Sequence, residues 1–186
     1  MDRVTDEALV DEIRGGSTVA FVELMQRYES AVYRVGYSYA RNPEDAMDIV
    51  QECFLKVHSR LDGYAGRGKF RAWLLQIAHR QSLDWVRARR RRPQHEELTP
   101  ASSPSQPAEQ DQRLIEHERS AWLHEELTKL NPRQHLALSL RYDQGLPIRE
   151  ISAILDCSDA VTKNILYRAV EKLRRGMTKP AEEDRE

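Results

Sequence analysis

The sequence lacks the features that mark membrane, secreted and disulfide-rich proteins. None of its apolar runs approaches the roughly 18 residues that a membrane-spanning helix needs. Its first residues, 1–7, are mostly polar and acidic and contain no apolar stretch typical of a secretory signal. Only two cysteines occur, Cys53 and Cys157, and neither belongs to a CxxC pair. We therefore expect a cytoplasmic protein with no membrane insertion, free thiols and no metal site.

The small total charge hides a strong segregation of charge along the chain. The formal net charge is -1 over 186 residues. By segment it is -5 over residues 1–66, +8 over 67–92, -5 over 93–130, +4 over 131–179 and -3 over 180–186. Two basic segments separated by acidic ones indicate two surfaces for nucleic acid, with acidic regions left for a different, basic partner.

The first basic segment combines an amphipathic helix with an arginine tract. The apolar residues that share one helix face are Phe70, Trp73, Leu74, Ile77, Ala78 and Trp85. Polar side chains, among them His79 and Arg80, fall on the wet side. Cations suit a phosphate backbone and flat rings suit unstacked bases, although we expect Trp73 to be a core residue. An ordinary core helix followed by a solvated tail is the alternative.

Two further helices are expected before this segment. One follows Ser17 as N-cap, and its apolar positions are Phe21, Leu24, Tyr28, Val32, Val35 and Tyr39. The other begins at Asn42 and Pro43, a capping residue followed by a proline suited to the first helical position. Its inward residues are expected to be Ala46, Ile49, Val50, Cys53 and Val57. Residues 60–69, which contain three glycines, are read as a loop.

An acidic stripe is expected on another face of the helix that begins at Asn42. Asp45, Asp48 and Glu52 are spaced so that they line up along that face. Taken alone, such a stripe is more often a solvated surface than a binding site.

Residues 93–112 divide the chain. They contain four prolines and three serines, with hardly any large apolar residue, so they cannot build a core. Neither half shows the alternating β-branched runs of strands. The fold class is therefore all-α, with helical domains at 1–92 and 113–179, a flexible linker at 93–112 and an acidic tail at 180–186.

The second half contains the spacing of a helix-turn-helix. One helix is marked by Leu123, Leu127 and Leu130, and another starts at Asn131-Pro132, runs through Leu140 and ends at 143–145. A short helix at 148–155 and a tight turn at 156–157 precede a helix that Ser158 can cap. The last helix presents Lys163, Asn164, Tyr167 and Arg168, which suit the major groove of duplex DNA.

Together these segments resemble the bacterial RNA polymerase sigma factors of the extracytoplasmic-function group, group 4 of the sigma-70 family. That group keeps only the second and fourth sigma regions, joined by a linker. The resemblance is carried by residues 42–54, by 70–74 with Ile77, Ala78 and Asp84, by 130–134, and by 167–169 with 171–174. Their order and spacing around an acidic, proline-rich linker span nearly the whole chain.

The resemblance implies an alternative sigma factor that binds core RNA polymerase, directs it to promoters and helps melt the minus-ten element. It gives the acidic stripe a role, with core-polymerase contacts at Asp45, Asp48, Gln51 and Glu52. It implies that minus-ten DNA, as a melted single strand, meets Tyr64, Arg67, Lys69, Arg71, His79, Arg80, Arg87, Arg89 and Arg90, with a pocket for an extruded base in the 60–69 loop. Minus-thirty-five duplex would meet Arg149, Lys163, Asn164, Tyr167 and Arg168. An anti-sigma factor is a further partner typical of the family.

Two other classes of function make different demands on the sequence. A stand-alone helix-turn-helix regulator, whose N-terminal half dimerises or senses a signal, would bind a palindrome without polymerase. An enzyme would need an acid and histidine set such as His117, Glu118 and His124, but no hydrolase, phosphate-loop or metal motif accompanies them. We therefore expect no catalytic residue and no cofactor.

Overall fold

The regular secondary structure of the described residues is entirely helical, as the sequence predicted. The computed structural model describes residues 4–66, 69–91 and 125–177. The N-terminal helices are α1 (Asp6–Arg14), α2 (Thr18–Ala40), α3 (Pro43–Arg60), the 3₁₀ turn η1 (Leu61–Gly63) and α4 (Phe70–Arg91). The C-terminal helices are α6 (Pro132–Leu138), the π-helical η2 (Ser139–Asp143), α7 (Ile148–Leu155) and α8 (Asp159–Met177). The expected linker and acidic tail lie outside the described residues.

Side-chain caps start the first three helices. Ser17 accepts a hydrogen bond from the backbone of Ala20, and Asn42 accepts from those of Glu44 and Asp45, which confirms both predicted N-caps. Thr5 caps α1 in the same way, but this nine-residue helix was not predicted, because only Leu9 and Val10 are buried on it. Two buried residues are too few to show the helical repeat of apolar positions in a sequence.

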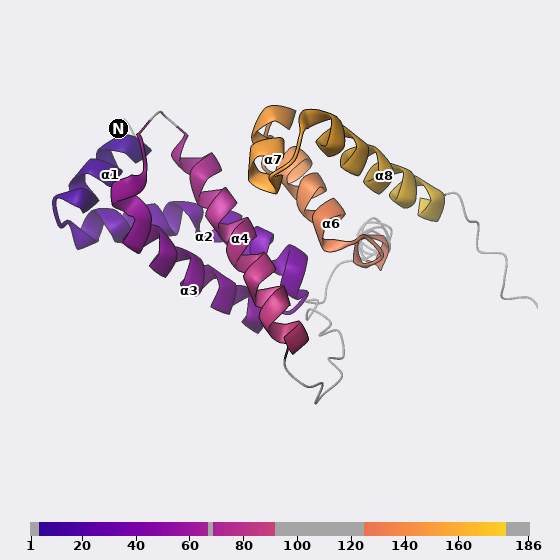
Figure 1. Cartoon of the computed structure of the whole chain (residues 1–186), viewed down its shortest axis with the longest axis horizontal. Coiled ribbons are helices and arrows are strands. Elements are labelled where there is room, and N and C mark those ends of the chain that lie inside the picture. The colour runs from indigo at the N-terminus through magenta and orange to yellow at the C-terminus, as the bar shows by residue number, and fades with distance from the viewer. Residues whose placement is uncertain (1–3, 67–68, 92–124, 178–186) are drawn as a thin grey trace, which may run out of the picture.

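Helices α2, α3 and α4 pack together and form most of the N-terminal domain (Figure 1). The predicted inward residues of α3 are all buried, namely Ala46, Ile49, Val50, Cys53 and Val57. Arg14 of α1 donates to the backbone carbonyls of Leu61 and Tyr64, which ties α1 to the turn that follows α3. The apolar faces that the sequence predicted are thus buried where these helices pack against one another.

The C-terminal domain contains the expected helix-turn-helix. Asn131 and Gln134 form a reciprocal capping box at the start of α6. The sequence predicted one continuous helix that runs through Leu140 and ends at 143–145, but the α-helix ends at Leu138 and a π-helical turn continues to Asp143. Its wider ring is visible in the hydrogen bond from the Gln144 backbone N–H to the Ser139 carbonyl, 3.0 Å. The tight turn before α8 places Asp156 at a left-handed φ of 53°.

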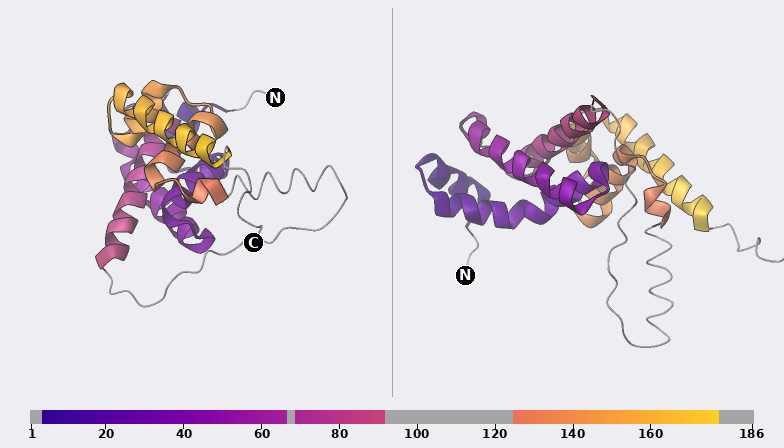
Figure 2. Two further views of the ribbon diagram at one scale, coloured as in Figure 1. Left: turned by 90° about the vertical axis from the view of Figure 1, so that its right-hand side faces the viewer. Right: turned by 90° about the horizontal axis from the view of Figure 1, so that it is seen from below.

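The two domains lie side by side and share one apolar core. Helices α2 and α4 contact α6 and α7 (Figures 1 and 2), and the main cluster of buried residues includes Val35, Leu75, Leu136 and Ile154 from these four helices. Helix α8 lies on the far side of α6 and α7 from the N-terminal domain (Figure 1). Within the described ranges, no helix is both long and apolar enough to span a bilayer.

Candidate functional site

The acidic stripe on α3 is exposed along most of its length. Asp48, Gln51 and Glu52 are exposed, whereas Asp45 is half-buried and forms an ion pair of 3.0 Å with Arg89 of α4. Leu55 lies one turn beyond Glu52 and two turns beyond Asp48 on the same face, and it is 66 % exposed. The sequence analysis missed this exposed leucine, which lies outside the inward-facing apolar positions of the helix.

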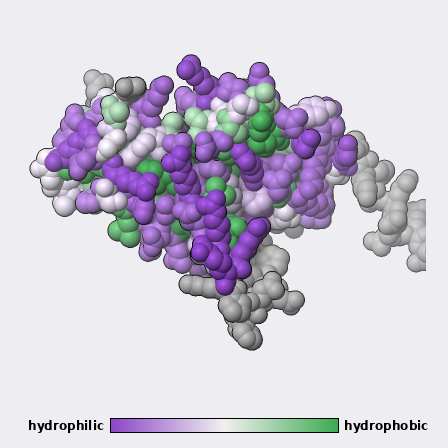
Figure 3. All heavy atoms as spheres, viewed as in Figure 1, coloured by the Kyte–Doolittle hydropathy of each residue, from purple (hydrophilic) through white to green (hydrophobic). Residues whose placement is uncertain are grey.

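The C-terminal half of α4 carries a dense positive surface. Arg80, Arg87, Arg89 and Arg90 are all exposed, and Figure 3 shows strongly hydrophilic side chains gathered over this end of the helix. Arg87 pairs with Asp84 at 2.9 Å, while Arg89 pairs with Asp45 and lies 5.1 Å from the centre of the Trp85 ring. Because these ion pairs are solvent-exposed, they compete weakly with an incoming phosphate.

Tyr64 lies inside the N-terminal domain, and this corrects its prediction as a residue open to a base. Its side chain is 6 % exposed, and its ring packs against those of Phe70 and Trp73 at 5.5 and 5.1 Å. Its hydroxyl donates to Glu7 at 3.2 Å and accepts from the backbone N–H of Lys69 at 3.1 Å. Burial raises the pKa of Tyr64. Trp73 packs on the core, as expected.

Lys69 lies at the end of the loop that Tyr64 holds, and its side chain is exposed and open to a DNA strand. Arg67 lies outside the described residues.

His79 is also a core residue and not a promoter contact in this conformation. It is 3 % exposed, and its Nδ1 lies 2.9 Å from the Tyr39 hydroxyl. Burial lowers the pKa of His79 to about 4, and the positive charge of Arg133 from the C-terminal domain contributes to this lowering. The ring is therefore neutral at physiological pH. The spacing of apolar residues along α4 predicted that His79 faces solvent. The sequence of a single helix does not reveal the second domain that covers this residue.

Arg71 is engaged by the C-terminal domain. Its guanidinium donates to both the backbone carbonyl and the side-chain carbonyl of Gln144, each at 3.1 Å. The residue is half-buried. In this arrangement it holds two domains together, and it reaches a DNA strand only if Gln144 moves away.

The exposed face of α8 carries the predicted duplex-reading residues. Lys163, Asn164, Tyr167 and Arg168 are all exposed, and Arg149 is exposed on α7. The inward side of α8 is fixed by buried Thr162, Leu166 and Ala169, and Ser158 accepts a hydrogen bond from the Val161 N–H at the start of the helix. This orients the polar row away from the core.

A hollow of about 490 Å³ lies between the start of α6 and α8. Arg133, Asn164 and Arg168 line it, together with the capping pair of α6. Arg133 was not among the predicted contacts, since its position at a helix start gave no charge cluster in the sequence. Its guanidinium donates to the Leu155 carbonyl at 2.8 Å, so it also links α6 to α7.

The described residues bring no three histidine, cysteine or acidic side chains together as a metal site. Cys53 is buried and Cys157 half-buried, and both are free thiols. Burial raises the pKa of Cys53 to about 12, so this thiol is unreactive in the folded protein.

Comparison with known families matches both domains. The sigma-70 region 2 model matches residues 24–92, and the sigma-70 region 4 model matches residues 120–173, so that together they cover more than half of the chain. The extracytoplasmic-function RNA polymerase sigma-E factor of Haemophilus influenzae is 28% identical over 181 residues, covering 92% of this chain and 95% of its own. The sigma-E factor of Escherichia coli K12 is 28% identical over 180 residues, covering 92% and 94%.

Two solved structures share the fold. CnrH in complex with the cytosolic domain of CnrY aligns with a TM-score of 0.65 at 23% identity, covering 92% of this chain and 96% of that one. The sigma factor RpoE of Bartonella quintana, in complex with the anti-sigma factor NepR, aligns with a TM-score of 0.67 at 21% identity, covering 89% and 98%. The protein is not an enzyme: it belongs to the extracytoplasmic-function group of sigma-70 factors and directs RNA polymerase to promoters.

Proposed function

We propose that three separate surfaces divide the work of this sigma factor. The acidic stripe of α3 binds core polymerase, the exposed basic residues of α4 and the preceding loop hold the minus-ten strand, and α8 reads the minus-thirty-five element. The observation that carries this proposal is the separation of charge: exposed carboxylates lie on α3, whereas exposed cations lie on α4 and α8.

Core polymerase binds the stripe through Asp48, Gln51 and Glu52. Leu55 on the same face adds an apolar contact, since the buried centre of a protein interface is more apolar than its rim. Asp45 acts differently from its neighbours. Its ion pair with Arg89 positions the end of α4 and leaves this carboxylate only partly available to polymerase.

The minus-ten strand binds along Lys69, Arg80, Arg87, Arg89 and Arg90, with Arg71 joining once it leaves Gln144. Melting needs base unstacking, which costs a few kcal/mol per step, and contacts that hold the separated strand offset this cost. An extruded base sits beside the loop that follows η1, and the buried ring of Tyr64 forms the floor of that loop.

The minus-thirty-five duplex binds α8. Lys163, Asn164, Tyr167 and Arg168 enter the major groove, Arg149 contacts phosphate, and Arg133 contributes from the neighbouring hollow. The protein acts in the cytoplasm, where polymerase and chromosome are found. Because a solved neighbour is in complex with an anti-sigma factor, we extend the proposed partners to a protein of that kind.

Charge reversal on the acidic stripe tests the first contact. The double variant Asp48→Arg/Glu52→Arg is expected to lose core binding in a pull-down at low salt, because two attractive contacts become repulsive. Its helical circular dichroism should be unchanged, since both side chains are exposed. The matched control is Asp11→Arg/Glu12→Arg on α1, which makes the same change of charge at exposed positions. Undiminished capture of core by the α3 variant would refute the assignment.

A further inference from the structure

Helix α1 is attached to the rest of the N-terminal domain through several polar contacts. Only Leu9 and Val10 are buried on it, yet it contacts both α2 and η1 (Figure 1). The match to the region 2 family model begins at residue 24, after α1. The helix also belongs to none of the three proposed binding surfaces. Its contacts therefore bear on a role that the family match does not assign.

Arg14, the last residue of α1, binds the end of η1. A single guanidinium nitrogen, Nη2, donates to the backbone carbonyls of Leu61 (2.9 Å), Asp62 (3.4 Å) and Tyr64. The last carbonyls of a helical segment lack partners within it and carry partial negative charge, which a guanidinium matches. The ion pair of Arg14 with Asp11 is longer, 3.6 Å, and Asp11 is exposed, so it holds the guanidinium weakly.

Glu7, two turns earlier on α1, holds the same loop at a second point. Its carboxylate accepts a hydrogen bond of 3.2 Å from the hydroxyl of Tyr64. That hydroxyl in turn accepts from the backbone N–H of Lys69 at 3.1 Å. A chain of two hydrogen bonds therefore runs from α1 across the loop to the residue that precedes α4.

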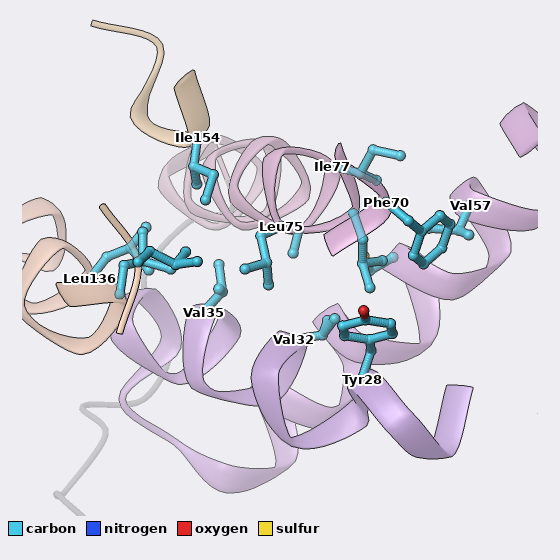
Figure 4. Packing of buried hydrophobic residues seen from close by; sticks show 14 of the residues in the cluster. Tyr28, Val32, Val35, Val57, Phe70, Leu75, Ile77, Leu136 and Ile154 are labelled. Carbon is cyan, nitrogen blue, oxygen red and sulfur yellow. The ribbon is translucent and has the colours of Figure 1, made fainter. Parts of the chain in front are cut away.

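The start of α1 is fixed to α2. Asp6 forms an ion pair of 2.6 Å with Arg27, and its other carboxylate oxygen accepts from the hydroxyl of Tyr28. The ring of Tyr28 lies 5.7 Å from that of Phe70, the first residue of α4 (Figure 4). One side of α1 is thus bound to a core helix and the other side to the loop.

The loop has little else to hold its shape. Of residues 62–66, only Tyr64 is buried. A Cβ atom added at Gly63 or Gly66 would meet nothing within 4 Å, so open space lies beside both, and Gly66 has a φ of 72°. This space leaves room for a base, but glycine leaves the backbone free to move. The shape of the loop therefore depends on Tyr64, and α1 binds both the carbonyl and the hydroxyl of that residue.

We propose that α1 is a brace for the loop of residues 61–66, and that Arg14 and Glu7 are positioning residues for capture of the extruded minus-ten base. The inference rests on the proposed function, because it takes this loop as the place that receives the base. Arg14 and Glu7 touch no DNA. They act through Tyr64, whose ring forms the floor of the loop.

The physical basis of the brace is preorganisation. A loop that must become ordered when a base enters loses conformational entropy at that moment, and this loss weakens binding. A loop that α1 already holds has lost that entropy on folding. Removing the brace should therefore weaken capture of the base, while the phosphate contacts along α4 remain.

The test uses holoenzyme, formed from the full chain and core polymerase, and a labelled single strand that spans the minus-ten element of a promoter transcribed by the wild type. A set of strands carries one abasic site at each minus-ten position in turn. The abasic position that weakens wild-type binding most identifies the captured base. Comparing that strand with the intact one separates capture of the base from binding of the phosphates.

Arg14→Gln is expected to weaken binding of the intact strand about tenfold, because it removes the charged donor to the carbonyls. Binding of the abasic strand should change little. Arg14→Lys should restore most of the affinity, since one nitrogen makes all three contacts and an ammonium has three N–H donors. The matched control is Arg34→Gln, the same change of charge at an exposed residue of α2 that donates to Ser30 of its own helix.

A second pair of variants tests the other contact of the brace. Glu7→Ala removes the acceptor for the Tyr64 hydroxyl and should show the same selective loss on the intact strand. Glu7→Gln keeps a carbonyl acceptor and should bind like the wild type. Core capture should be unchanged in all these variants. Wild-type affinity of Arg14→Gln or Glu7→Ala for the intact strand, or an equal loss on both strands, would overturn the brace.

The wild-type protein tests the proposed function separately. If no abasic position changes wild-type affinity, base capture by the loop is wrong and the brace is overturned with it. If wild-type binding depends on one base and Arg14→Gln keeps that dependence in full, the brace alone is overturned. A dependence that Arg14→Gln loses and Arg14→Lys restores would support both.

Discussion

At the scale of single residues, the fate of a polar side chain depends on its partners. His79 lies within the basic helix α4 and Tyr64 just before it, yet both polar side chains are buried, because Tyr39 pairs with the imidazole and Glu7 and Lys69 satisfy the phenol. A buried polar group with partners is tolerated, whereas one without partners is costly. By contrast, Lys163 and Arg168 remain exposed, as their residue types predicted.

The burial of His79 makes stability depend on pH. Its pKa is lowered to about 4 in the folded protein, against about 6.5 for an ordinary histidine, so the unfolded chain binds the proton more readily between these values. The contribution of neutral His79 is complete above about pH 6.5 and is lost as the pH falls towards 4. The loss in unfolding free energy should approach about 3 kcal/mol. Urea unfolding between about pH 7 and pH 4 measures it.

His79→Gln is the comparison for this measurement, since glutamine keeps a polar partner for Tyr39 but does not titrate. The free energy of unfolding of the variant should fall less steeply over the same range. Parallel curves for the two proteins would show that His79 is not the responsible group.

At the scale of elements, capping residues predicted where helices begin, and the helical spacing of apolar residues predicted which face of each helix is inward. Asn42 with Pro43 starts α3, Ser158 starts α8, and the inward positions of α3 are buried as expected. The π-helical turn after Leu138 escaped prediction, because its extra residue changes the hydrogen-bond ring without changing composition. The short helix α1 escaped because it buries too little to show a period.

The exposed row on α8 predicts selective damage to promoter use. Lys163→Ala/Arg168→Ala should weaken binding to promoters mainly through the upstream element, by about 1 to 3 kcal/mol for each base interaction that the alanines remove. Electrophoretic shift of polymerase holoenzyme on promoter fragments measures the effect. The control is a fragment in which the minus-thirty-five sequence is scrambled, where wild type and variant should differ little. An equal loss of affinity on both fragments would show that these residues bind DNA only through non-specific charge interactions.

At the scale of the whole molecule, one core runs through both domains. Val35, Leu75, Leu136 and Ile154 belong to a single cluster that crosses the domain boundary, although the linker divides the sequence into two parts. Shared burial couples the two halves energetically, because separating them exposes apolar surface on each.

This coupling predicts a single thermal transition for the free protein. Calorimetry should give equal calorimetric and van't Hoff enthalpies of unfolding for the wild type. Arg41→Gly should broaden or split the transition, because it loosens the contact that links the domains. Two resolved transitions in the wild type would mean that the domains unfold independently.

What the sequence determined by itself was the helical class, the helix-turn-helix, the segregation of charge and the family, since each depends on local spacing and residue type. Tertiary structure alone decided that Tyr64 and His79 are buried, that Asp45 pairs with Arg89, and that Arg41 and Arg71 bind the other domain. The physical reason is that these outcomes depend on tertiary contacts that the helical spacing of apolar residues does not reveal. Tyr64 bonds to Glu7, 57 positions away, and the contacts of the other residues join positions from 40 to 89 apart.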